Sequence, residues 1–361
     1  MTSKDILTPG KAHLGFGAMR LPGEDEAKKM VDAYLQSGGN YIDTAYIYTG
    51  SEELLKKALV NRHPRDNYML ANKLPGWHVK KPEDRDKIFQ ESLKRCGVDY
   101  FDFYLVHSLF DKDEKFVEEM QLFEYVQDLK KKGLVRHVGF SFHGSATYLD
   151  RLLHRHPSVE FVQLQLNYID VLRGPAGEWH QLAIKHNKPI IVMEPIKGGA
   201  LAKLPPSAEA MLKTYDPKRS IASWAMQYAG TLENVTCVLS GMSNTAQMTD
   251  NIETYKNLKS LTPQECELLE NVLVEMSKVS GIACTACKYC HAHCPQEIDI
   301  ASCFSLYNEV KRGSEKWNRE MVYDALGKKA IDCTQCGACT AHCPQQLDIP
   351  KELGLVGKEF H

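Results

Sequence analysis

HLGFGAMRLPGEDEAKKMVDAYLQSGGNYIDTA, residues 13–45, holds a complete strand–helix–strand unit. Its apolar ends, HLGFGAM (13–19) and NYIDTA (40–45), predict strands. Between them, apolar side chains recur at helical spacing until Gly38 ends the helix. Two strands joined by a helix in this way favour a parallel sheet covered by helices.

The same alternation repeats eight times up to about residue 258. The further expected strands are YMLANKL (68–74), FDFYLVHS (101–108), VRHVGFSF (135–142), FVQLQLN (161–167), PIIVMEP (189–195) and VTCVLSG (235–241). The expected helices include SEELLKKALVN (51–61), DRDKIFQESLKRCG (84–97), EKFVEEMQLFEYVQDLKKKG (114–133), SIASWAMQYAG (220–230) and NTAQMTDNIETYKN (244–257). Eight such units in about 250 residues match an α/β fold of the (β/α)8 barrel type better than an open doubly wound sheet. A GxGxxG phosphate loop is also missing after the first strand.

The last part of the chain spells Cys-x-x-Cys-x-x-Cys-x-x-x-Cys-Pro twice. This spacing is typical of ferredoxins, in which the fourth cysteine of each run usually ligates the other cluster. We therefore expect two 4Fe-4S clusters with crossed ligation. The expected ligand sets are Cys284, Cys287, Cys290 and Cys343 for one cluster, and Cys333, Cys336, Cys339 and Cys294 for the other.

A zinc ribbon and a set of disulfides are the alternatives for these cysteines. Structural zinc sites usually pair two close ligands with two distant ones, whereas four close cysteines with a trailing proline recur here. Disulfides suit small secreted scaffolds, whereas the start MTSKDILTPGK (1–11) has no apolar secretory region. Both alternatives are disfavoured. The cysteines outside the runs are expected to be small buried hydrophobic residues: Cys96, Cys237, Cys266 and Cys303.

The cysteine runs also divide the chain into expected domains. Residues 1–260 would form the barrel and residues 281–361 a small, mainly helical ferredoxin-like domain. A linking helix is expected within 261–280, with Thr262 as N-cap and Pro263 at the first helical position. Between the two runs, residues 300–329 predict two helices broken near Gly313.

The composition excludes several classes of protein. Of the 361 residues, 43% are hydrophobic and 25% are charged, as in a soluble globular protein with a substantial core. A net charge of -2 offers no basic excess for nucleic acid. No apolar segment approaches the roughly 18 residues of a membrane span. Unpaired thiols and exposed clusters favour a reducing cytoplasm.

Four polar residues fall where the early strands end, which is where a (β/α)8 barrel builds its active site. Asp43 ends the second strand, Tyr48 lies in the following loop, and Lys73 and His107 end the third and fourth strands. Neighbouring parallel strands bring such ends together. Taken singly, each residue has a structural alternative, namely a buried ion pair, a core aromatic ring or a hydrogen-bonded barrel histidine. Their joint placement favours one catalytic pocket.

The sequence strongly resembles the aldo-keto reductase superfamily over about three quarters of its length. The resemblance rests on GFGAMRLP (15–22), YIDTAYIYTGSEE (41–53), LANKL (70–74), YLVHS (104–108), VGFSFHG (138–144) and VLSGMSNTAQMTDNI (238–252). The appended cysteine runs are similar to those of the iron-sulfur subgroup of these enzymes. The resemblance implies an NAD(P)H-dependent oxidoreductase that interconverts a small carbonyl compound and its alcohol.

The chemistry of the four residues agrees with that implication. Tyr48 would act as general acid or base, but a phenol with a pKa of about 10 is a weak acid at neutral pH. A nearby Lys73 ammonium favours the phenolate, and Asp43 would keep the lysine charged and oriented. His107 would donate a hydrogen bond to the substrate oxygen or relay the proton. Tyr46 is the competing phenol, but its spacing from Asp43 does not fit the family.

The resemblance implies nicotinamide contacts at other strand ends. Ser141 and Gln163 would hold the carboxamide, with Gly17 and Met19 at the first strand and Met193 in place of the usual aromatic platform. Lys197 would meet the pyrophosphate, or be a solvated loop lysine. The adenosine end would be bound by Gly241, Ser243, Gln247 and Asn251. NADPH is expected and NADH is the alternative, because Gln247 replaces the arginine that a 2′-phosphate prefers. Phe142 replaces the family's usual asparagine.

The substrate pocket would draw on Met19, Tyr46, Trp77 and Phe110, unless these side chains serve loop packing. The clusters would be structural, would dock a redox partner protein, or would deliver electrons through an intermediary, since a hydride carries two electrons and a cubane passes one. The alternative function is an electron-transfer or redox-sensing subunit whose barrel binds nicotinamide without carbonyl chemistry.

Overall fold

The computed structural model describes residues 6–8, 12–279, 281–311 and 316–360. Its internal contacts divide the chain into two compact units. The first comprises residues 1–195 and 223–261, and the second comprises residues 196–222 and 262–361. The segment 196–222, which follows the seventh strand in the chain, thus belongs with the cysteine runs.

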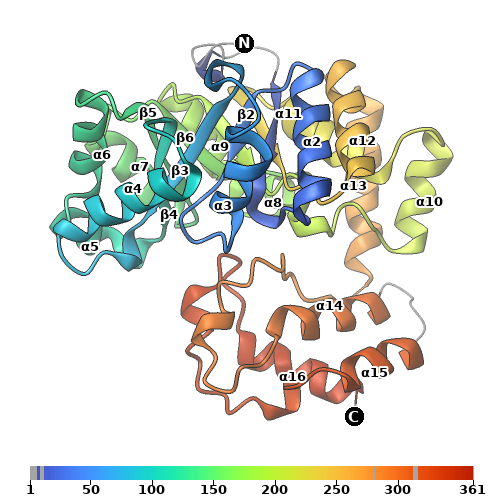
Figure 1. Cartoon of the computed structure of the whole chain (residues 1–361). Coiled ribbons are helices and arrows are strands. Elements are labelled where there is room, and N and C mark those ends of the chain that lie inside the picture. Colours follow the sequence, from blue (N-terminus) through green and yellow to red (C-terminus); the bar gives the residue numbers. More distant parts are fainter. Residues whose placement is uncertain (1–5, 9–11, 280, 312–315, 361) are drawn as a thin grey trace. The chain divides into compact units, whose positions relative to one another are not determined.

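The first unit is a closed barrel of eight parallel strands in chain order (Figure 1), as expected for a (β/α)8 fold. The ladder closes between the first and last strands, with His13 opposite Cys237. The strands are β1 His13–Gly17, β2 Tyr41–Asp43, β3 Met69–Pro75, β4 Phe101–Leu109, β5 Val135–Phe142, β6 Phe161–Gln165, β7 Ile190–Met193 and β8 Val235–Ser240.

Helices surround this barrel, as the alternating pattern predicts. They are α2 Glu24–Gln36, α3 Ser51–Leu55, α4 Glu83–Cys96, α5 Glu114–Glu119, α6 Leu122–Lys131, α7 Ala146–Arg155, α8 Tyr168–Arg173, α9 Ala176–Lys185, α11 Ile221–Gly230 and α12 Thr245–Lys256. Two expected helices differ from the prediction. Residues 51–61 form α3 followed by a π-helix at Lys56–Val60, and residues 114–133 form two helices because Gln121 takes a left-handed φ of 49°.

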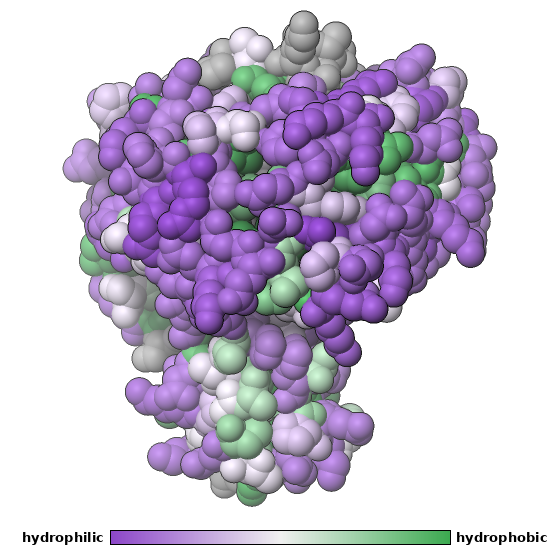
Figure 2. Space-filling model, turned by 90° about the vertical axis from the view of Figure 1, so that its left-hand side faces the viewer, coloured by the Kyte–Doolittle hydropathy of each residue, from purple (hydrophilic) through white to green (hydrophobic). Residues whose placement is uncertain are grey.

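The interior of the barrel is filled by large apolar side chains. A buried cluster inside it includes Tyr41, Met69, Phe103, Phe161 and Ile191, which come from five different strands. These strands are buried on both faces, as parallel strands beneath a helical layer should be. The face drawn in Figure 2 is mainly hydrophilic, with scattered hydrophobic patches. Within the described residues, no helix combines the length and the apolar character that crossing a membrane requires.

The second unit is mainly helical. Its helices are α10 Pro206–Tyr215, α13 Pro263–Ser277, α14 Ile300–Lys311, α15 Lys316–Asp324 and α16 Ile349–Phe360. The predicted start of α13 is confirmed: Thr262 accepts the backbone N–H of Glu265, and Glu265 accepts the N–H of Thr262. The expected break near Gly313 falls outside the described residues. A separate apolar core, which includes Ile298, Phe304, Tyr323 and Val356, packs against the cysteines.

Candidate active site and cysteine cavities

The structure brings the four sequence-predicted catalytic residues together at the carboxyl ends of β2, β3 and β4. Lys73 Nζ donates to Asp43 Oδ1 at 2.5 Å and to the Thr44 carbonyl at 2.8 Å. The same nitrogen lies 3.4 Å from the Tyr48 hydroxyl. The rings of Tyr48 and His107 meet edge to face with centroids 6.1 Å apart. A phenol, an ammonium, a carboxylate and an imidazole thus lie together at this end of the barrel.

Burial dominates the electrostatics of the Asp43–Lys73 pair. Both side chains are almost fully buried, at 4% and 1% exposure. Burial raises the pKa of the Asp43 carboxyl and lowers the pKa of the Lys73 ammonium, and the attraction between the two opposes both shifts. Gln163 supports the charged form of Asp43 by donating to its other oxygen at 3.3 Å. The ammonium is therefore fixed in place, beside the phenol.

His107 is held neutral by its surroundings. Burial, and then the neighbouring Lys73, His143 and His78 groups, lowers its pKa well below the usual value. A neutral imidazole carries one N–H donor and one acceptor nitrogen. His107 is thus suited to donate a hydrogen bond to a carbonyl oxygen without bringing a charge of its own.

Aromatic and imidazole rings surround this pocket. The ring of Trp77 lies 5.3 Å from that of His107, and Phe110 stacks on His143 at 5.4 Å. Tyr46 is different, because its hydroxyl donates to Glu91 at 2.8 Å and the Arg95 guanidinium covers its ring. Sequence reasoning missed His143, although it directly follows the fifth predicted strand.

The residues expected to bind nicotinamide occupy the ends of later strands. Ser141 and Gln163 are opposite each other in the β5–β6 ladder, so a hydroxyl and an amide lie side by side. The Ser141 hydroxyl oxygen accepts the backbone N–H of Ser108 at 2.7 Å. A carboxamide needs both a donor and an acceptor, and this pair supplies them. Gly17 and Met193 end β1 and β7, and Met19 lies in a short 3-10 helix after β1.

The residues expected at the adenosine end follow β8. Gln247 accepts the backbone N–H of Ser243 at 2.8 Å, and Asn251 donates to the Ser240 hydroxyl at 2.9 Å. Gly241 directly follows the strand, with open space where a Cβ would stand. Lys197 belongs to the second unit, where its ammonium donates to the Gln345 side chain at 3.3 Å.

The eight motif cysteines line two cavities in the second unit. One cavity is lined by Cys284, Cys287, Cys290 and Cys343. The other is lined by Cys294, Cys333, Cys336 and Cys339. Each set takes three cysteines from one run and one from the other. Within the described residues, no three His, Cys, Asp or Glu side chains converge on a position for a single metal ion.

The two runs also share one backbone conformation. Ala286 and Gln335 hold equivalent left-handed positions, with φ of 53° and 58°. Their backbone N–H groups donate to the first cysteine sulfurs, Cys284 and Cys333, both at 3.4 Å. Burial, and then neighbouring thiols, raises the pKa of Cys290 to about 12. Four crowded thiolates need positive charge between them, so the donor sets fit an iron-sulfur cluster.

The other cysteines were expected to be buried. Cys96, Cys237 and Cys303 are buried, whereas Cys266 on α13 is exposed, so that expectation is wrong for Cys266.

Comparison with known proteins agrees with both halves of this description. Residues 13–273 match the Aldo/keto reductase family. The chain belongs to this family. Residues 283–347 match the 4Fe-4S dicluster domain. This aldo/keto reductase is therefore an oxidoreductase with a C-terminal iron-sulfur domain.

Individual relatives support the assignment of the barrel. An aldo-keto reductase of Mycolicibacterium smegmatis is 33% identical over 144 residues, which is 39% of this chain and 50% of that protein. The uncharacterized oxidoreductase YqkF of Bacillus subtilis is 24% identical over 294 residues, or 72% of this chain and 92% of that one. The structure of aldo-keto reductase AKR11C1 from Bacillus halodurans aligns with a TM-score of 0.59 and 25% identity, covering 72% of this chain and 91% of that one.

Proposed function

We propose that this chain transfers a hydride between a nicotinamide cofactor and a small aldehyde or ketone, with Tyr48 as the general acid or base. The observation that carries the proposal is the position of the Lys73 ammonium. It lies 3.4 Å from the Tyr48 hydroxyl and is anchored to Asp43 at 2.5 Å. An adjacent positive charge favours loss of the phenolic proton, which is the step that general acid catalysis requires.

The remaining residues orient the substrate. Neutral His107 donates its N–H to the carbonyl oxygen, which places that oxygen beside the Tyr48 hydroxyl. Trp77, whose ring lies beside that of His107, would contact the substrate. In the reverse direction, Tyr48 accepts the proton of an alcohol through the same contacts.

The chain's own residues also set the position of the nicotinamide, which supplies the hydride when bound. Ser141 and Gln163, opposite each other on β5 and β6, would hold its carboxamide. Ser243, Gln247 and Asn251 would meet the adenosine end. NADPH is the proposed cofactor and NADH the alternative, which fluorescence titration with each dinucleotide distinguishes.

Two 4Fe-4S clusters with crossed ligands are proposed for the second unit, each bound by the four cysteines of one cavity. Iron and sulfide analysis after anaerobic purification should give about eight irons per chain. Cys287→Ser and Cys336→Ser separate the two roles of the clusters. Loss of folding alone indicates a structural role, whereas intact folding with lost turnover indicates an electron route.

The catalytic proposal is tested by Tyr48→Phe on a panel of small aldehydes and ketones with NADPH. Removing the general acid should lower kcat by about 10²- to 10⁴-fold. The control is Tyr100→Phe, because Tyr100 precedes β4, far along the strand from His107, and its hydroxyl contacts Arg136. Unchanged reduction by Tyr48→Phe would refute the proposal and favour an electron-transfer or sensing role.

A further inference from the structure

Strand β3, which carries Lys73, continues beyond the end of its neighbour β2. The last residue pair between β2 and β3 joins Asp43 to Ala71, and the N–H of Thr44 then donates to the Ala71 carbonyl. Alternate residues of a strand direct their backbone groups to the same side. The N–H of Lys73 therefore faces the side that β2 has left, and a buried N–H needs an acceptor.

Asn72 supplies that acceptor from within β3. Its Oδ1 accepts the Lys73 N–H at 2.7 Å. Its Nδ2 donates to Glu52 Oε1 at 2.8 Å. Because successive side chains of a strand point to opposite faces, Asn72 lies outside the barrel wall while Lys73 points inside. Glu52 thus acts on the lysine through the backbone.

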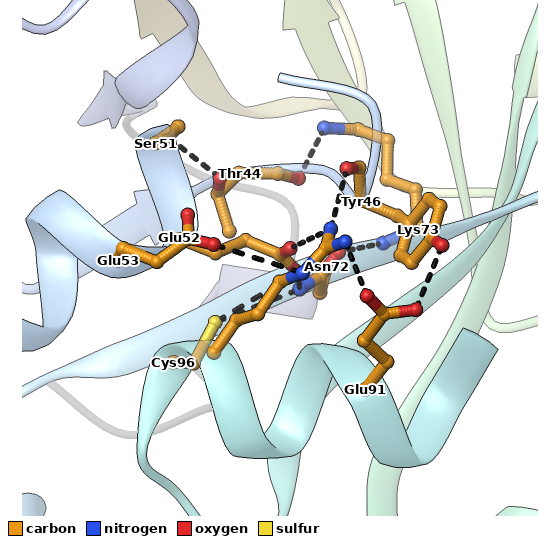
Figure 3. A network of polar contacts seen from close by, with 10 residues as sticks. Thr44, Tyr46, Ser51, Glu52, Glu53, Asn72, Lys73, Glu91 and Cys96 are labelled. Atoms are coloured by element: carbon orange, nitrogen blue, oxygen red, sulfur yellow. Dashed lines mark hydrogen bonds and ion pairs between the residues drawn. The ribbon is translucent and has the colours of Figure 1, made fainter. Parts of the chain in front are cut away.

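Glu52 also belongs to the polar network that reaches Tyr46 (Figure 3), two residues before Tyr48 in the same loop. Its second oxygen accepts Arg95 Nη1 at 3.2 Å. The same guanidinium nitrogen donates to the backbone carbonyl of Tyr46 at 3.4 Å. Glu91, which pairs with Arg95, accepts the Tyr46 hydroxyl at 2.8 Å. The Glu52 side chain is only 2% exposed, so its two contacts are made away from water.

One buried carboxylate therefore joins the strand of the ammonium to the loop of the phenol. We propose that Glu52 is a positioning residue that sets the separation of Lys73 Nζ and the Tyr48 hydroxyl. This inference rests on the proposed function, since the separation matters only if Tyr48 moves a proton.

The first test is Glu52→Gln. The amide keeps the size of the side chain, but Asn72 and Arg95 donate to different oxygens of Glu52, so one of these donors would face the NH2 group of the glutamine, which cannot accept. Loosening the Lys73–Tyr48 contact should lower kcat about 10- to 100-fold. The KM for the carbonyl and the dissociation constant for NADPH should stay within about twofold of the parent values, since neither ligand is touched. The pH midpoint of alcohol oxidation should move upward, because a more distant ammonium favours the phenolate less.

The matched control is Glu53→Gln. Glu53 neighbours Glu52 but is 53% exposed, and its carboxylate lies 3.6 Å from Arg95 Nε. Its kinetics should match the parent enzyme. A folded Glu52→Gln with an unchanged kcat and pH midpoint overturns the inference.

If Glu52→Gln does not fold, Arg95→Gln tests the same positioning role. Arg95 is 29% exposed, and its loss frees the loop at Tyr46 but leaves the contact between Glu52 and Asn72. The fall in kcat and the rise in the pH midpoint should therefore be smaller than in Glu52→Gln. No shift in a folded Arg95→Gln likewise overturns the inference. Tyr48→Phe, measured alongside, separates the two ideas. If it stays fully active, the proposed function fails, whereas if it is inactive and Glu52→Gln is normal, only the positioning role fails.

Discussion

The imidazole rings of His293 and His342 lie face to face, with centroids 3.4 Å apart and planes 4° from parallel. Each histidine directly precedes the fourth cysteine of its run, Cys294 or Cys343. The two runs therefore meet at equivalent positions, one residue before the cysteine that lines the other run's cavity.

This stack should contribute to retention of the clusters. Alanine at His293, at His342 and at both positions completes a double-mutant cycle. Ring pairs contribute about 0.5–1.5 kcal/mol beyond their buried area, so the coupling should change the rate of cluster loss in denaturant by about two- to tenfold. Cluster absorbance followed over time measures it. Strictly additive effects of the two substitutions would contradict an energetic role for the stack.

Gly198 is packed directly against the first cysteine run. It has a left-handed φ of 63°, and a Cβ built on it would stand 2.4 Å from the Thr285 carbonyl oxygen. Gly198→Ala should therefore speed the release of iron to a chelator about tenfold or more, because overpacking costs about 1–3 kcal/mol. Gly199→Ala is the control, since its φ of 103° shares the backbone strain but nothing lies within 4 Å. Equal effects of the two changes would mean that strain alone matters.

Removing one partner of the Asp43–Lys73 pair should destabilise the protein. Lys73→Met leaves a buried carboxylate without its partner, which should lower the free energy of unfolding by about 3–5 kcal/mol. It should also lower kcat about 10²- to 10⁴-fold. Adding Asp43→Leu should restore most of the stability and none of the activity. Urea denaturation measures the stability and steady-state kinetics measure the activity of the same samples. A Lys73→Met variant as stable as the parent would contradict a stabilising role for the ion pair.

His143 should make the first unit sensitive to acid. Burial lowers its pKa from 6.5 to about 4. Below pH 6.5 His143 binds a proton in the unfolded chain but not in the folded chain, so a fall in pH favours unfolding. The contribution of neutral His143 to the free energy of unfolding is therefore complete above pH 6.5 and is lost as the pH falls toward 4. The shift corresponds to about 3 kcal/mol. His143→Gln should flatten the dependence of the melting temperature on pH in this window, whereas exposed His154→Gln should not. An unchanged slope in His143→Gln would refute the assignment.

The barrel and the position of the four pocket residues were predictable because both follow from local pattern. Alternating strands and helices specify the (β/α)8 class, and Asp43, Lys73 and His107 each fall at a recognisable strand end. Parallel pairing then brings them together without further information. The crossed grouping of cysteines was predictable for a similar reason, since it follows from their spacing.

The contacts that support the pocket were not predictable. The role of Asn72 depends on the pairing of β2 with β3 ending at Ala71, two residues before Lys73. Strand ends are the least certain feature of a sequence pattern. Gln121 takes a left-handed conformation where no glycine or asparagine signals it. Cys266 is exposed because α13 turns that face outward, which residue type alone does not reveal.

The sharing of cysteines between the two cavities has a consequence for biosynthesis. A nascent chain carries Cys284, Cys287 and Cys290 before Cys343 has been synthesised, so the cavity that these four residues line lacks its last cysteine until the second run is made. A product truncated between the runs completes neither set and holds no intact cofactor rather than half the complement. With the proposed crossed ligation, assembly of the two clusters would be all or none, and the thiols of the first run would have to stay reduced until the second run is made.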